Sequence, residues 1–259
     1  MKKFFYAVAF SVPAFTLWFC TSSTTVKEKE KNSQTSKTNL PVTKNIAVLE
    51  LFTSQGCSSC PPADKILGNY ISKSNVILLS FHVDYWDRQG WKDPYSAHEY
   101  SQRQYKYVSE LKTDVYTPQL IINGQSEMIG SDANKISSTL SKIFSEEPDA
   151  TLTIQKAESN NGEININFEA EGNTGNALLH IAVVEKETTT SIKAGENGGV
   201  TLTGYNVVRD FSTINQIVNG ENNASIDIPS SADIKNMAVV LFLQQKDNHK
   251  ITAASRLDL

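Results

Sequence analysis

The sequence predicts an α/β domain followed by a smaller, mainly antiparallel β-sandwich domain. Two observations support this order. Between residues 45 and 148, buried apolar runs alternate with segments of helical periodicity. After Pro148, short runs of partly alternating hydrophobicity recur between Gly and Asn turns, which is typical of an antiparallel sandwich. At 259 residues, 39% of them hydrophobic, the chain is long enough for two domains with separate cores.

Residues 1–20 are typical of an export signal. A basic start, Lys2-Lys3, precedes an apolar run from Phe4 to Phe19 that is short for a membrane span. Cys20 follows this run directly, where a bacterial lipoprotein has its lipidated cysteine. We expect lipidation of Cys20; the alternatives are a plain secretory signal and an uncleaved anchor.

The composition of residues 21–44 predicts a flexible tether. They are mostly Ser, Thr, Lys, Glu and Asn, so they cannot bury enough apolar surface to offset the entropy of ordering. If Cys20 is removed or lipidated, the remaining thiols are Cys57 and Cys60, an even number that suits an oxidising compartment. We therefore expect the protein in the bacterial cell envelope, periplasmic, and attached to a membrane if Cys20 carries a lipid.

The first domain, residues 45–148, has the predicted order β-α-β-α-β-β-α. Its segments are a strand at Ile46–Phe52, a helix at Ala63–Ile71, a strand at Val76–Val83, a helix at Ser96–Leu111, strands at Gln119–Ile122 and Ser126–Ile129, and a helix at Asp132–Phe144. Asn123-Gly124 predicts a tight hairpin turn between the two short strands. The polar and aromatic residues 84–94 predict a long loop, and loops of this length often carry function.

The second domain, residues 149–259, is predicted to contain seven strands. They are expected at Thr151–Ala157, Glu163–Ala170, Ala177–Glu185, Leu202–Arg209, Ala224–Ile228, Met237–Gln244 and Ile251–Leu257.

The motif Cys57-Ser58-Ser59-Cys60 joins the first strand to the first helix. A cysteine in the first turn of a helix meets unpaired N–H groups and the positive end of the helix dipole, which favour the thiolate. We therefore expect Cys57 to attack a partner disulfide and Cys60, three residues later and deeper, to resolve the mixed disulfide. A strand, a cysteine pair and a helix in this order predict a thioredoxin-like domain with a Cys57–Cys60 disulfide.

Five other residues are candidates for this site. Glu50 is expected to be a buried carboxylate that accepts the proton of the resolving thiol, or else to face solvent at an edge. A cis Thr117-Pro118 bond would expose backbone that pairs with an extended substrate; the alternative is an ordinary trans turn. Trp86 and Trp91 are expected to line a substrate groove or to pack inside their loop.

Two other functions remain open. Cys57, Cys60 and His82 could bind or deliver a soft metal such as copper, whereas a zinc site would need a second pair of ligands that the sequence lacks. The cysteines could also form an inert disulfide in a non-catalytic envelope protein. No cofactor is expected. Nucleic acid is not expected as a partner, because the formal net charge is −4 and Lys and Arg are not clustered.

Six segments carry a resemblance to a known family: Glu50 to Asp64, His82 to Asp87, Gly90 to Pro94, Thr117-Pro118-Gln119, Gly195-Glu196-Asn197 and Asn206 to Arg209. They resemble an uncharacterised bacterial family of predicted secreted thioredoxin-like proteins, the family of unknown function 1223. The resemblance implies a thioredoxin-like fold followed by a small β domain, without a substrate. We expect an exported thiol–disulfide oxidoreductase whose partners are protein thiols or disulfides of the envelope, with reductase, oxidase and isomerase all open.

Overall fold

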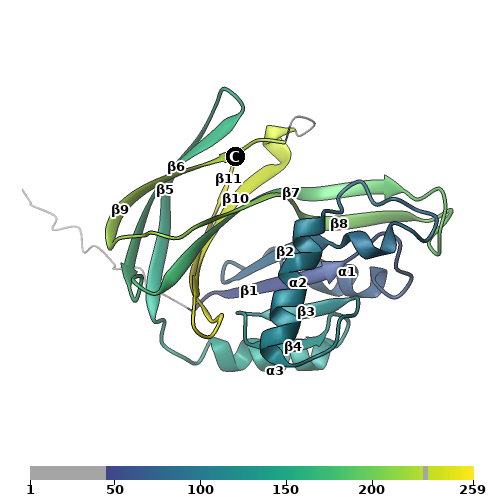
Figure 1. Cartoon of the computed structure of the whole chain (residues 1–259), viewed down its shortest axis with the longest axis horizontal. Coiled ribbons are helices and arrows are strands. Elements are labelled where there is room, and N and C mark those ends of the chain that lie inside the picture. Colours follow the sequence, from purple (N-terminus) through teal and green to yellow (C-terminus); the bar gives the residue numbers. More distant parts are fainter. Residues whose placement is uncertain (1–44, 230–232) are drawn as a thin grey trace, which may run out of the picture. The chain divides into compact units, whose positions relative to one another are not determined.

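The computed structural model describes residues 45–229 and 233–259 (Figure 1). The expected export signal, the tether and Cys20 lie outside these residues. Within the described ranges, none of the helices combines the length and hydropathy of a membrane-spanning segment.

The first half of the described chain has the element order predicted from the sequence. Its elements are β1 (Ala47–Thr53), α1 (Pro61–Gly68), β2 (Val76–His82), the short 3-10 helix η1 (Asp84–Trp86), α2 (His98–Leu111), β3 (Gln119–Ile122), β4 (Ser126–Ile129) and α3 (Ala133–Ile143). Helix α1 begins two residues earlier than predicted, because Pro61 and Pro62 occupy its first positions, where a missing N–H costs nothing.

The second half contains a strand at each of the seven predicted places. These are β5 (Ala150–Asn160), β6 (Glu163–Gly172), β7 (Ala177–Ser191), β8 (Thr201–Ile214), β9 (Gly220–Asp227), β10 (Met237–Gln245) and β11 (Ile251–Asp258), with the 3-10 helix η2 (Ile234–Asn236) before β10. Strands β7 and β8 extend well beyond their predicted ends, into a long hairpin.

Strands from both halves form one mixed sheet of eight strands, in the order β11-β10-β7-β8-β2-β1-β3-β4. Strand β2 pairs in parallel with β1 and with β8, and the other neighbours are antiparallel. The expected boundary at residue 148 therefore does not separate two sheets. Strands β5, β6 and β9 form a second, three-stranded sheet.

The burial of β10 explains why the second half joins the large sheet. All nine of its residues are buried. Val240 and Phe242 pack in the same core as α2, whereas Val239 and Leu241 pack against the three-stranded sheet. A strand with apolar residues on both faces needs a covering layer on each side, which a two-sheet sandwich would not supply.

The two faces of β1 receive different helices. Leu49 and Leu51 pack with residues of α1 and α3, whereas Val48 and Phe52 pack with residues of α2. Because side chains alternate along a strand, this pattern fixes the face of every other residue in β1 and β2. Thr53 and His82, which are register partners at the ends of β1 and β2, lie on the α1 side.

Candidate functional site

The cysteine motif forms the connection between β1 and α1. Cys57 and Cys60 are joined by a disulfide, and the exposed fraction of both residues is 0%, whereas Ser58 and Ser59 between them are exposed. Cys60 is the N-cap of α1, and Cys57 lies in the turn before it. The structure thus corrects the expectation that Cys57 occupies the first helical turn, because Cys57 lies three residues before the N-cap.

The loop before β3 lies against the motif. The Thr117–Pro118 peptide bond is cis, as predicted. The Ser59 hydroxyl donates to the carbonyl oxygen of Thr117 at 3.3 Å. The Trp86 indole N–H donates to the Thr117 hydroxyl at 2.8 Å. Thr117, Pro118 and Trp86 therefore lie together beside the cysteines.

Trp91 contacts the segment that leads into the motif. Its indole N–H donates to the side-chain oxygen of Gln55 at 3.2 Å, and the Gln55 amide donates to the Thr190 hydroxyl at 2.9 Å. Both tryptophans are half-buried, and each has a hydrogen bond to a loop of the site. The tryptophans are thus held in place around the motif, with part of each ring exposed.

A buried ion pair lies beneath the cysteine loop. His82 Nδ1 is 2.7 Å from Asp93 Oδ2, and the Gln55 backbone N–H donates to the same oxygen at 2.8 Å. Burial by itself would lower the pKa of His82, but the charge and hydrogen bond of Asp93 outweigh it and raise that pKa above 6.5. The His82 Nε2 atom is buried and has no hydrogen-bond partner among the described residues.

Asp64 is a site residue that sequence reasoning missed. It lies one helical turn after Cys60, and its backbone N–H donates to the Cys60 carbonyl at 3.2 Å. Burial of its carboxyl raises its pKa from 3.8 to about 7, and the nearby charge of His82 acts in the opposite direction. The carboxyl also lines a cavity of about 280 Å³ between α1 and β8. The four-residue spacing from Cys60 was the sequence signal that could have identified it.

The structure places Glu50 away from the cysteines. Its side chain lies on the α2 face of β1, where it accepts hydrogen bonds from Arg103 Nε at 2.5 Å and from the Tyr107 hydroxyl. The expected role of Glu50 as proton acceptor for Cys60 is therefore wrong. Of the two alternatives left open by the sequence, the structure shows the buried one, and the buried partner of Glu50 is a guanidinium from α2.

The tip of the β7–β8 hairpin covers the motif. The side-chain amide of Asn197 donates to the carbonyls of Gln55, at 2.9 Å, and Cys57, at 3.0 Å. The Ser58 backbone N–H donates to the carboxylate of Glu196 at 3.0 Å. Sequence reasoning did not connect this tip with the site, because the contacts span about 140 residues; it identified Gly195-Glu196-Asn197 only as a segment that resembles the family.

The alternative metal site is not assembled in this state. Cys57 and Cys60 are bonded to each other, and His82 directs Nδ1 to Asp93. Within the part of the chain that the structure describes, no group of three or more His, Cys, Asp or Glu side chains has a metal-binding arrangement.

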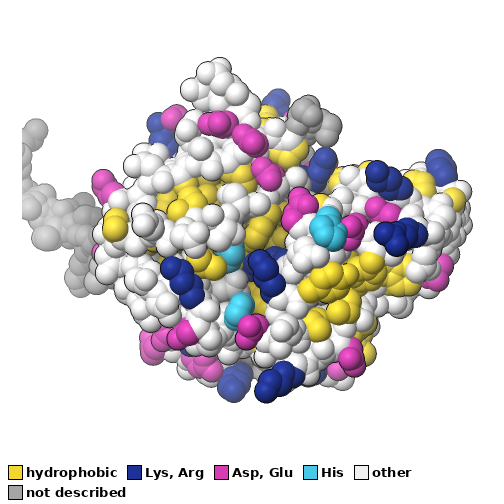
Figure 2. All heavy atoms as spheres, viewed as in Figure 1, with side chains coloured by type: hydrophobic (Ala, Val, Ile, Leu, Met, Phe, Trp, Pro, Cys, Tyr) yellow, Lys and Arg dark blue, Asp and Glu magenta, His cyan; other side chains and the backbone are white. Residues whose placement is uncertain are grey.

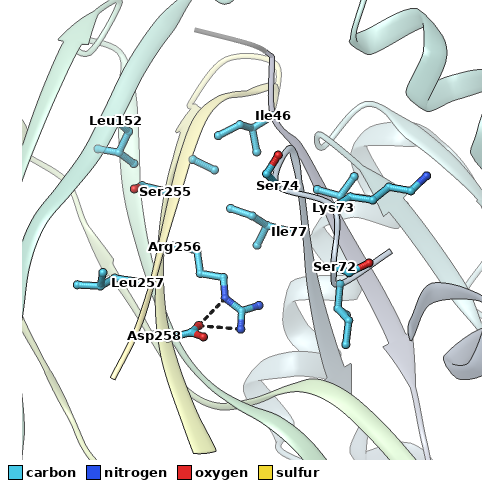
Figure 3. Close-up of a pocket in the computed structure, with 13 residues that line it drawn as sticks. Ile46, Ser72, Lys73, Ser74, Ile77, Leu152, Ser255, Arg256, Leu257 and Asp258 are labelled. Atoms are coloured by element: carbon cyan, nitrogen blue, oxygen red, sulfur yellow. Dashed lines mark hydrogen bonds and ion pairs between the residues drawn. The ribbon is translucent and has the colours of Figure 1, made fainter. Parts of the chain in front are cut away.

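A larger cavity, of about 440 Å³, lies at the opposite end of β1 and β2 (Figure 3). Its lining combines apolar residues such as Ile46, Ile77 and Leu257 with Arg256, which Asp258 binds. It has no cysteine or histidine in its lining, so it does not contribute to the site around the disulfide. On the face shown in Figure 2, basic and acidic side chains are interspersed, and hydrophobic side chains are visible in more than one place.

Fold and site together define a mixed α/β protein with a CxxC disulfide between the first strand and the first helix of a large sheet. The chain belongs to the family described as "Protein of unknown function (DUF1223)", which it matches over residues 48–244.

Two solved structures are similar over most of the chain. A protein from Agrobacterium tumefaciens, determined by a structural genomics consortium, is 30% identical with a TM-score of 0.64, covering 83% of this chain and 95% of the other. HBP35 of Porphyromonas gingivalis is 17% identical with a TM-score of 0.59, covering 83% of this chain and 76% of the other, which supports the fold alone. No protein with a curated function matches the chain.

Proposed function

We propose that the protein is an exported thiol–disulfide oxidoreductase with a thioredoxin-like first segment, acting on protein thiols or disulfides of the bacterial envelope. The observation that carries this proposal is the Cys57–Cys60 disulfide at the start of α1, in contact with the cis Thr117–Pro118 loop through Ser59. The export pattern of residues 1–20 and the even number of thiols after Cys20 support the location.

The reaction transfers two electrons between two dithiol–disulfide pairs. In the oxidised protein, a partner thiolate attacks Cys57 Sγ, the Cys57–Cys60 bond breaks, and Cys60 leaves as a thiolate. A second partner thiolate then attacks the partner sulfur of the mixed disulfide and releases Cys57. The partner ends as a disulfide, and the protein ends with two thiols. The reverse sequence reduces a partner disulfide.

We assign the exchange of the Cys60 proton to Asp64, which lies one helical turn after Cys60. A carboxyl with a pKa of about 7 is partly protonated at neutral pH, so it can donate a proton to the leaving thiolate and accept one from the thiol in the reverse direction. The cavity between α1 and β8 gives this carboxyl a route to solvent. His82 and Asp93 hold the loop that carries Cys57 through the Gln55 N–H.

The test is a redox titration of the full chain with Cys20→Ser, equilibrated against reduced and oxidised glutathione. A reversible two-electron couple, together with alkylation of Cys57 at a pH well below the ~8.5 of a free thiol, is the expected result. Cys57→Ser and Cys60→Ser are the controls, because each leaves one thiol and cannot cycle. A disulfide that stays locked across the titration would sink the enzymatic proposal.

The same titration assigns the direction. A potential near that of the cytosolic reductants, roughly −270 mV, would identify a reductase, and a potential near −120 mV would identify an oxidant. An insulin-reduction assay and a refolding assay on a reduced protein then check the assignment, because a reductase accelerates the first and an oxidase the second.

A further inference from the structure

A small cavity between α2 and the large sheet brings together polar side chains from segments that are far apart in the sequence. Its volume is about 80 Å³, which is room for roughly two or three water molecules at ~30 Å³ each, or for one small oxyanion. The polar residues of its lining are Arg103, Lys106 and Tyr107 of α2, His180 of β7, Gln244 of β10 and His249 of the β10–β11 connection. Among the described residues, none from the cysteine motif lines this cavity, so it is separate from the disulfide.

The side-chain acceptors of this lining are already used. Gln244 Nε2 donates to the His249 carbonyl at 2.8 Å, which fixes the orientation of the amide, because a carbonyl oxygen only accepts. Gln244 Oε1, 2.9 Å from His180 Nε2, therefore accepts from that ring nitrogen. His180 Nδ1 accepts from the Thr213 hydroxyl at 2.9 Å, and burial keeps the ring neutral because it lowers the pKa of His180 well below 6.5. The Tyr107 hydroxyl accepts from Gln244 Nε2 at 2.7 Å.

Three donors of the same lining have no partner among the described residues. The Arg103 guanidinium donates from Nε to Glu50 and from Nη2 to Tyr107, which leaves Nη1 without a hydrogen bond. The Lys106 ammonium has neither a hydrogen bond nor an ion pair. His249 Nδ1 is buried and has no hydrogen-bond partner. Within the described residues no carboxylate lines the cavity, so the missing partner is an acceptor that comes from outside the chain.

The charges around the cavity also favour an acceptor with a negative charge. Glu50 offsets the charge of Arg103 at the Nε edge, and Lys106 adds a second cation. Both cations lower the pKa of His180 further than burial alone does, so their fields reach the lining. Aromatic rings surround the guanidinium, with centroids 4.9 to 5.7 Å from its Cζ atom: those of Phe81, Tyr107, Phe211 and Phe242. Such apolar surroundings screen an ionic contact less than water does.

The position of His249 is fixed by two segments of the fold. Its backbone is left-handed, with φ of +60°, which is uncommon for a residue other than glycine. The turn between β3 and β4 lies against it, because a Cβ at Gly124 would overlap the His249 carbonyl oxygen. Two residues later, the Ile251 N–H donates to the Asn123 carbonyl of the same turn at 3.0 Å. The ring with the unpartnered Nδ1 is therefore held at the cavity before any ligand binds.

We propose that this cavity is a binding site for one small oxyanion, of the size of phosphate or of a carboxylate group. Arg103 Nη1, Lys106 Nζ and the Nδ1–H tautomer of His249 donate to its oxygen atoms. The oxyanion satisfies the donors that the chain leaves unpartnered, and its charge offsets that of Lys106. Binding at this cavity does not depend on the proposed function, because the disulfide does not contribute to the lining.

The test follows the ring signals of the four histidines by NMR, in the oxidised full chain at pH 7 and constant ionic strength. Sodium phosphate and sodium acetate are titrated separately. The signals of His180 and His249 are expected to follow one saturable curve, since both rings line the cavity. His98 is the internal control, because its side chain is 72% exposed and would respond to any non-specific anion effect.

Two variants test the named donors. Lys106→Gln and His249→Asn are each expected to weaken binding of the saturating anion about tenfold, the size of one hydrogen bond to a charged group. Asparagine tolerates the left-handed backbone of position 249, and the His180 signal then reports binding. Lys106 is exposed, so Lys106→Gln keeps the test decisive if the other variant fails to fold. Lys142→Gln is the matched control, because it removes the same charge from an exposed position of α3 outside the cavity.

The two titrations also identify the oxyanion. Saturation by acetate alone assigns the site to a carboxylate, saturation by phosphate alone assigns it to a phosphate group, and both results support the proposal. A drift of all four rings without saturation by either anion would overturn it. An affinity in Lys106→Gln equal to that of the wild type and of Lys142→Gln would overturn it as well, because binding would then occur elsewhere.

Discussion

The imidazole of His82 and the carboxylate of Asp93 form a buried pair, 2.7 Å apart, directly under the loop that leads to Cys57. The same carboxylate accepts the Gln55 N–H, two residues before the cysteine. The end of β2, the aromatic loop after it and the cysteine turn are thus tied to one oxygen atom. A change in the charge of this pair therefore affects the cysteine turn through the hydrogen bond from the Gln55 N–H to Asp93.

Asp93→Asn is expected to destabilise the protein most strongly below pH 6.5. The raised pKa of His82 means that its stabilising charge is fully present below 6.5 and is lost as pH rises through the raised value. Removing one member of a buried pair costs about 3 kcal/mol or more. Urea unfolding at pH 5.5 and pH 8.5 measures the cost, which should be smaller at the higher pH.

The control for this variant is His98→Gln. His98 pairs with Asp84, but its side chain is 72% exposed, and exposed pairs contribute about 0–1 kcal/mol. If Asp93→Asn lowers the free energy of unfolding equally at the two pH values, Asp93 stabilises the protein through its backbone hydrogen bonds alone and not through the charge of His82.

Asp64→Asn is expected to remove an ionisation near pH 7 from the exchange reaction. In the wild-type protein the rate of Cys60 release should change with an apparent pKa of about 7, and the profile of the variant should be flat there. Single-turnover reduction by dithiothreitol from pH 5.5 to 8.5, corrected for thiolate content of the reagent, gives this profile. A variant that keeps the inflection would assign it to another group.

The pH dependence of the free energy of unfolding tests the raised pKa of the Asp64 carboxyl independently. Because its pKa is raised from 3.8 to about 7, the folded protein binds the proton more tightly than the unfolded chain, and stability falls as pH rises across that interval. Asparagine has no ionisable group, so this loss of stability is absent in Asp64→Asn. At pH 8 the free energy of unfolding of the variant should exceed that of the wild type by about 2 kcal/mol, after allowance for the partial exposure of the side chain. The difference should be smaller at pH 4.

Glu50→Gln is expected to destabilise the protein without changing the redox equilibrium of the disulfide. The substitution leaves the Arg103 guanidinium, 11% exposed, without its counter-charge, which costs about 3–5 kcal/mol. Glu158→Gln is the control, because its pair with Lys156 is exposed and worth less than about 1 kcal/mol. If the folded Glu50→Gln variant resolves the mixed disulfide more slowly than the wild type, Glu50 does take part in the reaction of Cys60.

The strands and helices were predictable because each one carries its own local pattern. The apolar run before Cys57 and the turn residues Asn123-Gly124 correspond to β1 and to the β3–β4 hairpin. The shared sheet was not predictable, because it depends on the pairing of Ser80 with Val207, more than a hundred residues apart. Alternation within one strand does not identify the strand beside it.

The site was predictable where its residues are adjacent in sequence or have a special backbone. Cys57, Cys60 and Pro118 were found for these reasons. Glu50 was assigned to the wrong partner, because a buried acid reveals that it needs a counter-charge but does not identify the cation that supplies it. Asn197 was not identified as a site residue, since a side chain that caps a distant loop has no local pattern.

Gly68→Ala is expected to destabilise the two halves of the described chain together. A Cβ at Gly68, the last residue of α1, would lie 2.5 Å from the ring of Tyr205 in β8, so the helix or the strand must move. Overpacking of this kind costs about 1–3 kcal/mol. Gly175→Ala is the matched control, because nothing lies within 4 Å of a Cβ there.

The position of this contact makes the result informative about folding. Because β8 pairs with β2 in the same sheet, the loss should appear as one shifted transition when fluorescence and far-ultraviolet circular dichroism are both followed. Two separated transitions in Gly68→Ala, with only the first displaced, would instead support two domains divided near residue 148. A single transition means that β8 and the helix whose N-cap is Cys60 unfold as one unit.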